Sequence, residues 1–288
     1  MPVSQRQIVR ACKPESARHG GHFEALRMGA TIFGPEGDPW LNLDHFRMAG
    51  PTFPPHRDAG FSAVTYILRD SRGGMANRDS RGDRSLIDPG GLHWTAAGRG
   101  IVHEEIPAEP GSLTEGFQIF IRQPVEQEGQ PPAIAHVDAE SVPVIALPTG
   151  GTVRILAGEY DGRSVPFATP SPIAMFDLLL DVGQEFLWTP PAAYQSLSLY
   201  LFAGALAEEG ADAVGFAAPL LLVFARDSAP LRVTAGENGT RVLVMAGKPL
   251  NAPSVSNGPF VLSSPAALEE AVGRYRSGAM GALSPEWD

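Results

Sequence analysis

Short apolar stretches, each about four to eight residues long, recur along the whole chain, and Gly, Pro, Asp or Asn bound them. They are rich in Val, Ile, Leu, Phe, Tyr and Thr, which is typical of β-strands joined by turns. The first half holds HFEALRMGATIFG, LNLDHFRM, FSAVTYIL, GLHWTAA, GIVHEEI and GFQIFIRQP; the second holds GTVRILAGEY, IAMFDLLLDV, SLSLYLFAGAL, PLLLVFA, LRVTAG and TRVLVMAG. About a dozen strands with little helical periodicity between them predict an all-β fold of sandwiches or barrels.

The strands fall into two sets, separated by the Pro- and Gly-rich interval PVEQEGQPP at residues 124–132. This composition is typical of a linker between two β units. We therefore expect one domain over residues 1–135 and a second over residues 136–288.

A single helix is predicted near the end of the chain. Ser264 can cap its beginning, and Pro265 suits the first helical position. Leu268, Val272 and Tyr275 then follow at spacings of four and three, so they share one face. We expect this face to pack on a sheet.

Composition supports a folded chain of 288 residues, because 43% of them are hydrophobic and only 19% are charged. The 32 Gly and 27 Pro residues are about a fifth of the chain, which favours strands and turns over a helical bundle. The formal net charge is −10, so anionic partners would be repelled. We expect no direct binding to nucleic acid and none to a membrane.

The lone cysteine, Cys12, excludes an intrachain disulfide and a thiolate metal cluster. The first residues contain no apolar segment typical of a signal peptide, and no apolar run is long enough to cross a bilayer. These features predict a soluble, cytoplasmic protein.

Candidate chemistry is concentrated in two segments, FPPHRDAGF with His56 and Asp58, and GRGIVHEEIP with His103 and Glu105. Residues i and i+2 of a strand point to the same face, so each pair presents two possible metal ligands together. If the two strands are neighbours and both pairs point inward, two imidazoles and two carboxylates converge. That set suits a divalent first-row metal, with iron the first choice and manganese, zinc or nickel as alternatives.

A simpler interpretation is that each pair lies on the solvated face of an amphipathic strand. Glu104 is out of phase with His103 and should face the other way, so we do not expect it to be a ligand. His93 has no partner at i+2, and we expect it to pack beside Trp94. Motifs of α/β-hydrolases, zincins and nucleotide-binding loops are missing, which disfavours those functions.

The segment from Trp40 to Glu105, with LNLDHF, FPPH and HWTAAGRGIVHEE, resembles the pirin family of bicupins. The likeness continues through SPIAMFDLLLDVGQEF, SLSLYLFAGAL, GKPLNAP, NGPFV and RYRSGAMG. It implies two cupin-type β-barrels, a single iron in the N-terminal barrel, and a C-terminal barrel without a metal site. His136 is the only histidine of the second half, which agrees with that expectation.

The resemblance also implies a ligand set, because the family holds its metal with an H-x-H pair and an H-x-E pair. His56, His103 and Glu105 match three of these positions, and Asp58 stands where the second histidine is expected. Either the metal shifts toward the shorter side chain, a water bridges the gap, or the site binds metal weakly or not at all. We predict that Asp58 favours the ferric state and weakens the attraction for an anionic substrate.

Two activities are implied by the family. One is a metal-dependent dioxygenase for flavonols such as quercetin, with Glu105 as a ligand or as a general base. The other is a non-enzymatic module whose metal changes its surface for a regulatory protein partner. A third interpretation is a metal-free bicupin with a pocket for a small metabolite. The sequence leaves all three open.

Overall fold

The computed structural model describes residues 6–207 and 215–285. The chain forms two compact units, and neither is continuous in sequence. Unit 1 comprises Met1–Pro14, Ala30–Pro39 and Val142–Pro249, and unit 2 comprises Glu15–Gly29, Trp40–Ser141 and Leu250–Asp288. Strands make up 51% of the structure and helices 8%, so the predicted all-β class with a short C-terminal helix is confirmed.

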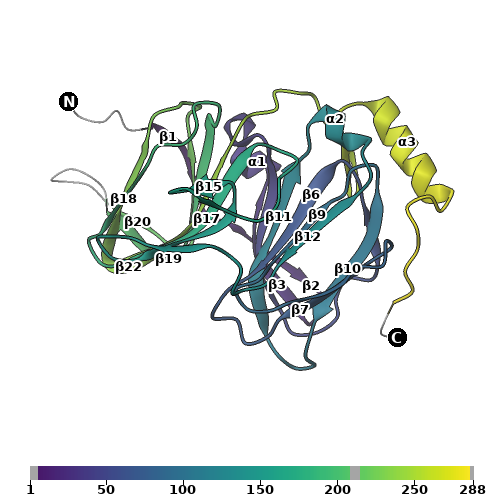
Figure 1. The fold of residues 1–288 in the computed structure, drawn as a ribbon, viewed down its shortest axis with the longest axis horizontal. Helices are drawn as coiled ribbons and strands as arrows, with labels where there is room; N and C mark the ends of the chain where they lie inside the picture. Colours follow the sequence, from purple (N-terminus) through teal and green to yellow (C-terminus); the bar gives the residue numbers. More distant parts are fainter. Residues whose placement is uncertain (1–5, 208–214, 286–288) are drawn as a thin grey trace. The chain divides into compact units, whose positions relative to one another are not determined.

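Unit 2 contains two antiparallel sheets. The larger has the order β12-β9-β6-β11-β4-β3-β2, and β12, β9, β6 and β11 can be followed side by side in Figure 1. Its strands are β2 (Glu15–His19), β3 (Phe23–Gly29), β4 (Trp40–Met48), β6 (Phe61–Ile67), β9 (Leu92–Ala96), β11 (Thr114–Arg122) and β12 (Ala133–Val137). The smaller has the order β5-β10-β7-β8, with β5 (His56–Asp58), β7 (Met75–Asp79), β8 (Arg84–Ile87) and β10 (Ile101–Pro107).

The burial pattern explains why these segments become strands. All seven residues of β6 are buried, so its nearly continuous apolar run is that of a central strand covered on both faces. β3 instead alternates between buried and open positions over much of its length, as expected of a strand with one wet face. One core cluster in unit 2 is formed by Phe23, Ala25, Phe46, Met48, Ile67, Met75 and Ile87.

The predicted C-terminal helix is present as α3 (Pro265–Arg276). The Ser264 hydroxyl accepts a hydrogen bond from the Ala267 amide at 3.2 Å, and Pro265 occupies the first turn. The helix belongs to unit 2, together with the short strands β23 (Val255–Asn257) and β24 (Phe260–Leu262). The segment read as a linker contains one helical turn, α2 (Val125–Glu128), also in unit 2.

Unit 1 is built around a nine-stranded antiparallel sheet. Seven strands follow the order β1-β21-β19-β22-β17-β14-β13, while β18 pairs with β22 and β20 with β19. The bounds are β1 (Ile8–Cys12), β13 (Val144–Ala146), β14 (Thr152–Ala157), β17 (Ile173–Leu180), β18 (Glu185–Trp188), β19 (Ser196–Ala207), β20 (Phe216–Ala217), β21 (Leu220–Phe224) and β22 (Leu231–Gly247). The hairpin of β15 (Glu159–Tyr160) and β16 (Arg163–Ser164), the turn α1 (Ala30–Phe33) and the 3-10 turn η1 (Pro35–Gly37) complete the unit.

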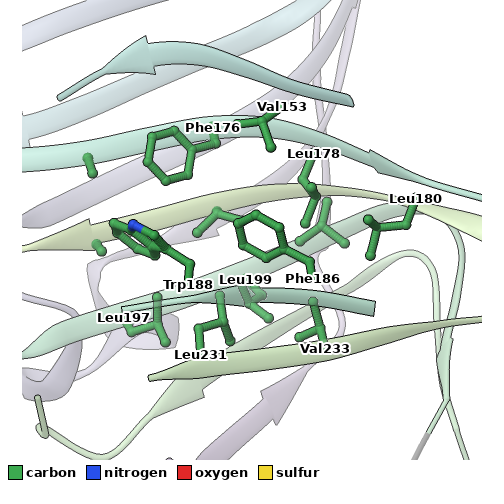
Figure 2. Packing of buried hydrophobic residues seen from close by; sticks show 14 of the residues in the cluster. Val153, Phe176, Leu178, Leu180, Phe186, Trp188, Leu197, Leu199, Leu231 and Val233 are labelled. Carbon is green, nitrogen blue, oxygen red and sulfur yellow. The ribbon is translucent and has the colours of Figure 1, made fainter. Parts of the chain in front are cut away.

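The core of unit 1 is apolar and aromatic, and Figure 2 shows the side chains of β14, β17, β18, β19 and β22 that meet in it. Phe176 lies edge-on to Trp188, with ring centroids 4.9 Å apart.

Among the described residues, no helix combines the length and the apolar character needed to cross a membrane.

Candidate metal centre

The site begins with the pairing of β5 and β10 in the smaller sheet of unit 2. His103 lies directly opposite His56, and Ile101 lies opposite Asp58. Since His56 and Asp58 are two residues apart, their side chains share the face of the sheet that carries His103. Antiparallel pairing therefore brings together three side chains from segments more than forty residues apart in sequence.

The ligand atoms of His56, Asp58 and His103 all lie within 4.8 Å of one another. Nε2 of His103 donates a hydrogen bond to Oδ2 of Asp58 at 3.1 Å. The two imidazole rings lie 4.6 Å apart between centroids and are tilted by 53°. Three of the four predicted ligands thus meet at one point.

The orientation of His56 is fixed by the backbone. Its Nδ1 atom lies 3.1 Å from the carbonyl oxygen of Pro54. A carbonyl can only accept, so Nδ1 carries the proton and Nε2 keeps its lone pair. Burial lowers the pKa of His56, and the charge of the neighbouring His103 lowers it further. The neutral, metal-binding form of this imidazole is therefore favoured.

His103 is in a different electrostatic environment although it is only 3% exposed. Burial lowers its pKa, but the hydrogen bond and the negative charge of Asp58, together with the charges of Glu105 and Asp79, outweigh burial, and the net effect raises the pKa. The imidazolium of His103 and the carboxylate of Asp58 stabilise each other. A metal that takes both side chains must displace this shared proton.

Glu105, the fourth predicted residue, reaches the same region of unit 2 but is held differently. The hydroxyl oxygen of Thr65 lies 2.8 Å from each of its carboxylate oxygens and 2.9 Å from Oε1 of Gln118. Burial raises the pKa of Glu105, although the His103 charge and the Thr65 hydrogen bond oppose this effect.

A pocket of about 450 Å³ opens beside these residues, a size within the usual range for small-molecule sites. His56, His103 and Glu105 line it. Its apolar walls come from Phe23, Phe46, Met48, Phe53, Met75 and Phe120, and its polar lining from Arg27, Asn42, Asp44 and Gln118. Metal-ligand side chains and aromatic walls therefore face a single cavity.

The donor set fits a first-row transition metal. Two imidazoles and one carboxylate are the ligands of non-haem iron oxygenases, and imidazole also suits zinc, copper and nickel. Nε2 of His56 is unprotonated, as a ligand must be. His56, Asp58 and His103 consequently form a candidate metal site.

Comparison with known proteins identifies the family. The family model described as "Pirin" matches residues 18–121, and "Pirin C-terminal cupin domain" matches residues 175–281. A Pseudomonas aeruginosa protein named "Putative quercetin 2,3-dioxygenase" is 33% identical over 283 residues, which is 91% of this chain and 96% of that protein. The chain belongs to the pirin family.

Solved structures of pirins and related proteins match the whole fold. A quercetin 2,3-dioxygenase from Acinetobacter baumannii has a TM-score of 0.84 and 26% identity, covering 97% of this chain and 99% of that one. A bacterial pirin from Escherichia coli, in complex with nickel(II), has a TM-score of 0.65 and 17% identity, covering 83% and 99%. This pirin is therefore a protein of two cupin domains.

Two neighbouring ionisable side chains, Glu104 and His93, lie apart from the converging trio. Glu104 points away from the trio and is fully buried in an ion pair with Arg78, which also donates to the Ser284 carbonyl. His93 is buried on β9, its ring 5.7 Å from that of His136. Among the described residues, neither ring nitrogen of His93 has a hydrogen-bond partner. Neither histidine belongs to the group of converging ligands.

Two residues beside the site were not indicated by the sequence: Gln118, which lines the pocket, and Thr65, which is hydrogen-bonded to Glu105. Thr65 lies in the strand FSAVTYI, where a threonine is an ordinary strand-forming residue. A hydroxyl at the centre of a fully buried strand needs a hydrogen-bond partner, and that was the available signal. Gln118 lies opposite Thr65 on β11, so its role depends on strand register, which the sequence alone did not supply.

Proposed function

We propose that this pirin is a metal-dependent dioxygenase that acts on a small aromatic substrate of the flavonol class, such as quercetin. The observation that carries the proposal is the convergence of His56, Asp58 and His103 in unit 2, two of them lining a pocket with aromatic walls. The names of the Pseudomonas aeruginosa relative and the Acinetobacter baumannii structure support the same substrate class.

Iron is the metal that we propose, held by Nε2 of His56, the Asp58 carboxylate and Nε2 of His103. Manganese, zinc and nickel accept the same donors, so the metal content of the purified protein is the direct test. When bound, the ion would supply Lewis-acid polarisation of a substrate oxygen and the redox chemistry that oxygen insertion needs.

The aromatic side chains of the pocket favour a flat aromatic molecule. Phe46, Phe53 and Phe120 present rings against which an aromatic substrate can pack, and their bulk excludes water from the reacting atoms. Asn42 and Gln118 add amide groups that can hydrogen-bond polar substituents. A polyhydroxylated aromatic compound can pack its rings against the phenylalanines and form hydrogen bonds with the amide groups.

Glu105 is the residue that we propose accepts the proton of the substrate hydroxyl. Its carboxyl group lines the pocket beside His103, and its raised pKa makes it a better base than an exposed glutamate. Thr65 fixes the direction of this carboxyl group through a hydrogen bond. Proton removal increases the negative charge on the substrate oxygen, which strengthens its attraction to a cation.

The experiment is oxygen uptake with quercetin by iron-loaded protein, with protein-free blanks to subtract spontaneous oxidation. We expect oxygen and quercetin to disappear in equal molar amounts, and His103→Ala to remove this activity. His22→Ala is the matched control, since His22 is exposed and outside the pocket. Tightly bound metal without turnover across flavonols and other aromatic compounds would instead favour the regulatory function.

A further inference from the structure

Glu105 is bound to a hydroxyl group and not to the converging trio. Both of its carboxylate oxygens lie 2.8 Å from the Thr65 hydroxyl, and it is absent from the set of ligand atoms within 4.8 Å of one another. Asp58 is in that set and has its own partner in His103. The two carboxylates of the site are thus engaged by different groups.

The Thr65 hydroxyl links Glu105 in the smaller sheet to Gln118 in the larger sheet. Thr65 on β6 lies opposite Gln118 on β11, and both are in the larger sheet, whereas Glu105 is on β10 of the smaller sheet. Thr65 is 1% exposed, so its hydroxyl has little access to competing water. A buried hydrogen bond between sheets therefore fixes the Glu105 carboxyl group.

The number of protons available around the Thr65 hydroxyl also indicates that Thr65 and Glu105 are hydrogen-bonded. A threonine hydroxyl has one proton, yet three oxygen atoms lie within 2.9 Å of it. The remaining contacts need a second donor, which is either a Gln118 amide turned to present its NH2 group or a proton on Glu105. In both arrangements Thr65 and Glu105 remain hydrogen-bonded.

The substitution at position 58 makes a three-ligand centre chemically complete. Two histidines and one carboxylate are the ligand set that non-haem iron oxygenases use. Asp58 supplies that carboxylate within the converging trio, so Glu105 is not needed as the anionic ligand.

We propose that Thr65 holds Glu105 outside the coordination sphere, so that His56, Asp58 and His103 alone bind the metal and three positions remain for a substrate that chelates through two adjacent oxygens. This inference rests on the proposed function, because it requires a metal at the trio. Catechols and 3-hydroxy-4-oxo compounds have the required pair of oxygens. Three protein ligands would leave room for both oxygens of such a substrate together with dioxygen, whereas a fourth protein ligand would remove one of these positions.

The first experiment measures Co²⁺ affinity by titration calorimetry on the full chain, without any assay of turnover. We expect His56→Ala and Asp58→Asn to lose more than about 100-fold in affinity, and Glu105→Gln to lose less than about 10-fold. An equal loss in Glu105→Gln and Asp58→Asn would overturn the inference and leave the metal-dependent function standing. Failure of the wild-type protein to bind Co²⁺ would overturn both.

A matched pair of substitutions tests the part played by Thr65. Thr65→Val preserves the shape of the side chain and removes the hydroxyl, whereas Thr65→Ser keeps the hydroxyl. We expect Thr65→Val to free Glu105 as an added ligand, which tightens Co²⁺ binding by about 10-fold and changes the visible absorption of the bound cobalt. Adding Glu105→Gln should cancel both effects. An unchanged affinity and spectrum in Thr65→Val would overturn the role of Thr65.

The chelation claim is tested with Fe³⁺-loaded protein and two probes that differ by one hydroxyl group. Catechol offers two adjacent oxygens and phenol offers one. We expect catechol to produce an intense visible charge-transfer band and to bind at least about 10-fold more tightly than phenol, since one more metal bond forms. Equal affinities, or the absence of the catechol band, would overturn the three-position centre.

Discussion

Asp58 accepts a hydrogen bond from Nε2 of His103 at 3.1 Å, and both side chains are almost completely buried. A histidine at position 58, which the family resemblance led us to expect, would be a neutral ligand. An aspartate adds one negative charge at the same point. Anionic ligands stabilise the higher oxidation state of a metal, so this one residue shifts the redox properties expected of the centre.

Replacing Asp58 with histidine tests that shift. We expect the reduction potential of bound iron to rise by on the order of 60 mV or more in Asp58→His, which corresponds to at least a tenfold change in favour of the ferrous form. A spectroelectrochemical titration measures it. Glu115→Gln, which changes a charge that pairs with His45 and Arg47, is the control and should leave the potential nearly unchanged. Equal potentials in wild type and Asp58→His would contradict the prediction.

Because His93 is buried in unit 2, we expect the folding stability of this unit to decrease at acidic pH. Burial, with a smaller contribution from the charges of His136 and His103, lowers the pKa of His93 from 6.5 to about 4, against the opposing effect of Asp83. The unfolded chain therefore binds a proton at a pH where the folded chain does not. Stability is fully present above pH 6.5 and falls as the pH approaches 4, by about 3 kcal/mol for this group.

Urea unfolding at a series of pH values measures the effect. His93→Leu should make the free energy of unfolding less dependent on pH between 6.5 and 4, because the group that titrates is gone. His22→Leu changes an exposed histidine and should keep the wild-type slope. Parallel curves for wild type and His93→Leu would show that His93 is not the source of acid sensitivity.

The fold was predictable because its signals are local. Hydrophobic runs and turn residues indicate strands without knowledge of their partners, and Ser264 followed by Pro265 marks the beginning of α3. Which segments of the chain belong to which unit was harder to predict from the sequence. Glu15–Gly29 and Ala30–Pro39 are consecutive in sequence but belong to different units, and no change in composition marks the crossing.

For the candidate site, the spacing of residues along a strand predicts which side chains share a face. An i, i+2 pair fixes which side chains share a face, so His56 with Asp58 and His103 with Glu105 could be chosen. Spacing along a strand does not predict which residue each side chain will hydrogen-bond. That Glu105 bonds Thr65, while Asp58 bonds His103, depends on the packing of two sheets and on side-chain length.

Glu104 offers a contrast with the adjacent Glu105, because it faces away from the pocket and is fully buried against Arg78. Removing one partner of a buried pair leaves an uncompensated charge, so Glu104→Ala should cost about 3–5 kcal/mol of unfolding free energy. Glu105→Gln keeps its size and should cost far less. Denaturant unfolding compares the two variants, and the Arg78→Met/Glu104→Met double variant should recover most of the loss. A loss in Glu104→Ala no greater than in Glu105→Gln would refute this contrast.

Gly60 controls the position of Asp58, two residues earlier in the chain. Its φ is +82°, and a Cβ added there would lie 2.0 Å from the carbonyl oxygen of Val261 in β24. Gly82 has a similar φ of +96° with no atom within 4 Å of the added Cβ, so it serves as a control for backbone strain alone. We expect Gly82→Ala to cost about 1–2 kcal/mol and Gly60→Ala clearly more, since the clash adds to the strain. Gly60→Ala should also weaken Co²⁺ binding, because moving the backbone after β5 displaces Asp58. Equal unfolding free energies for the two variants, with Co²⁺ affinity unchanged, would show that β24 does not constrain the metal-site strand.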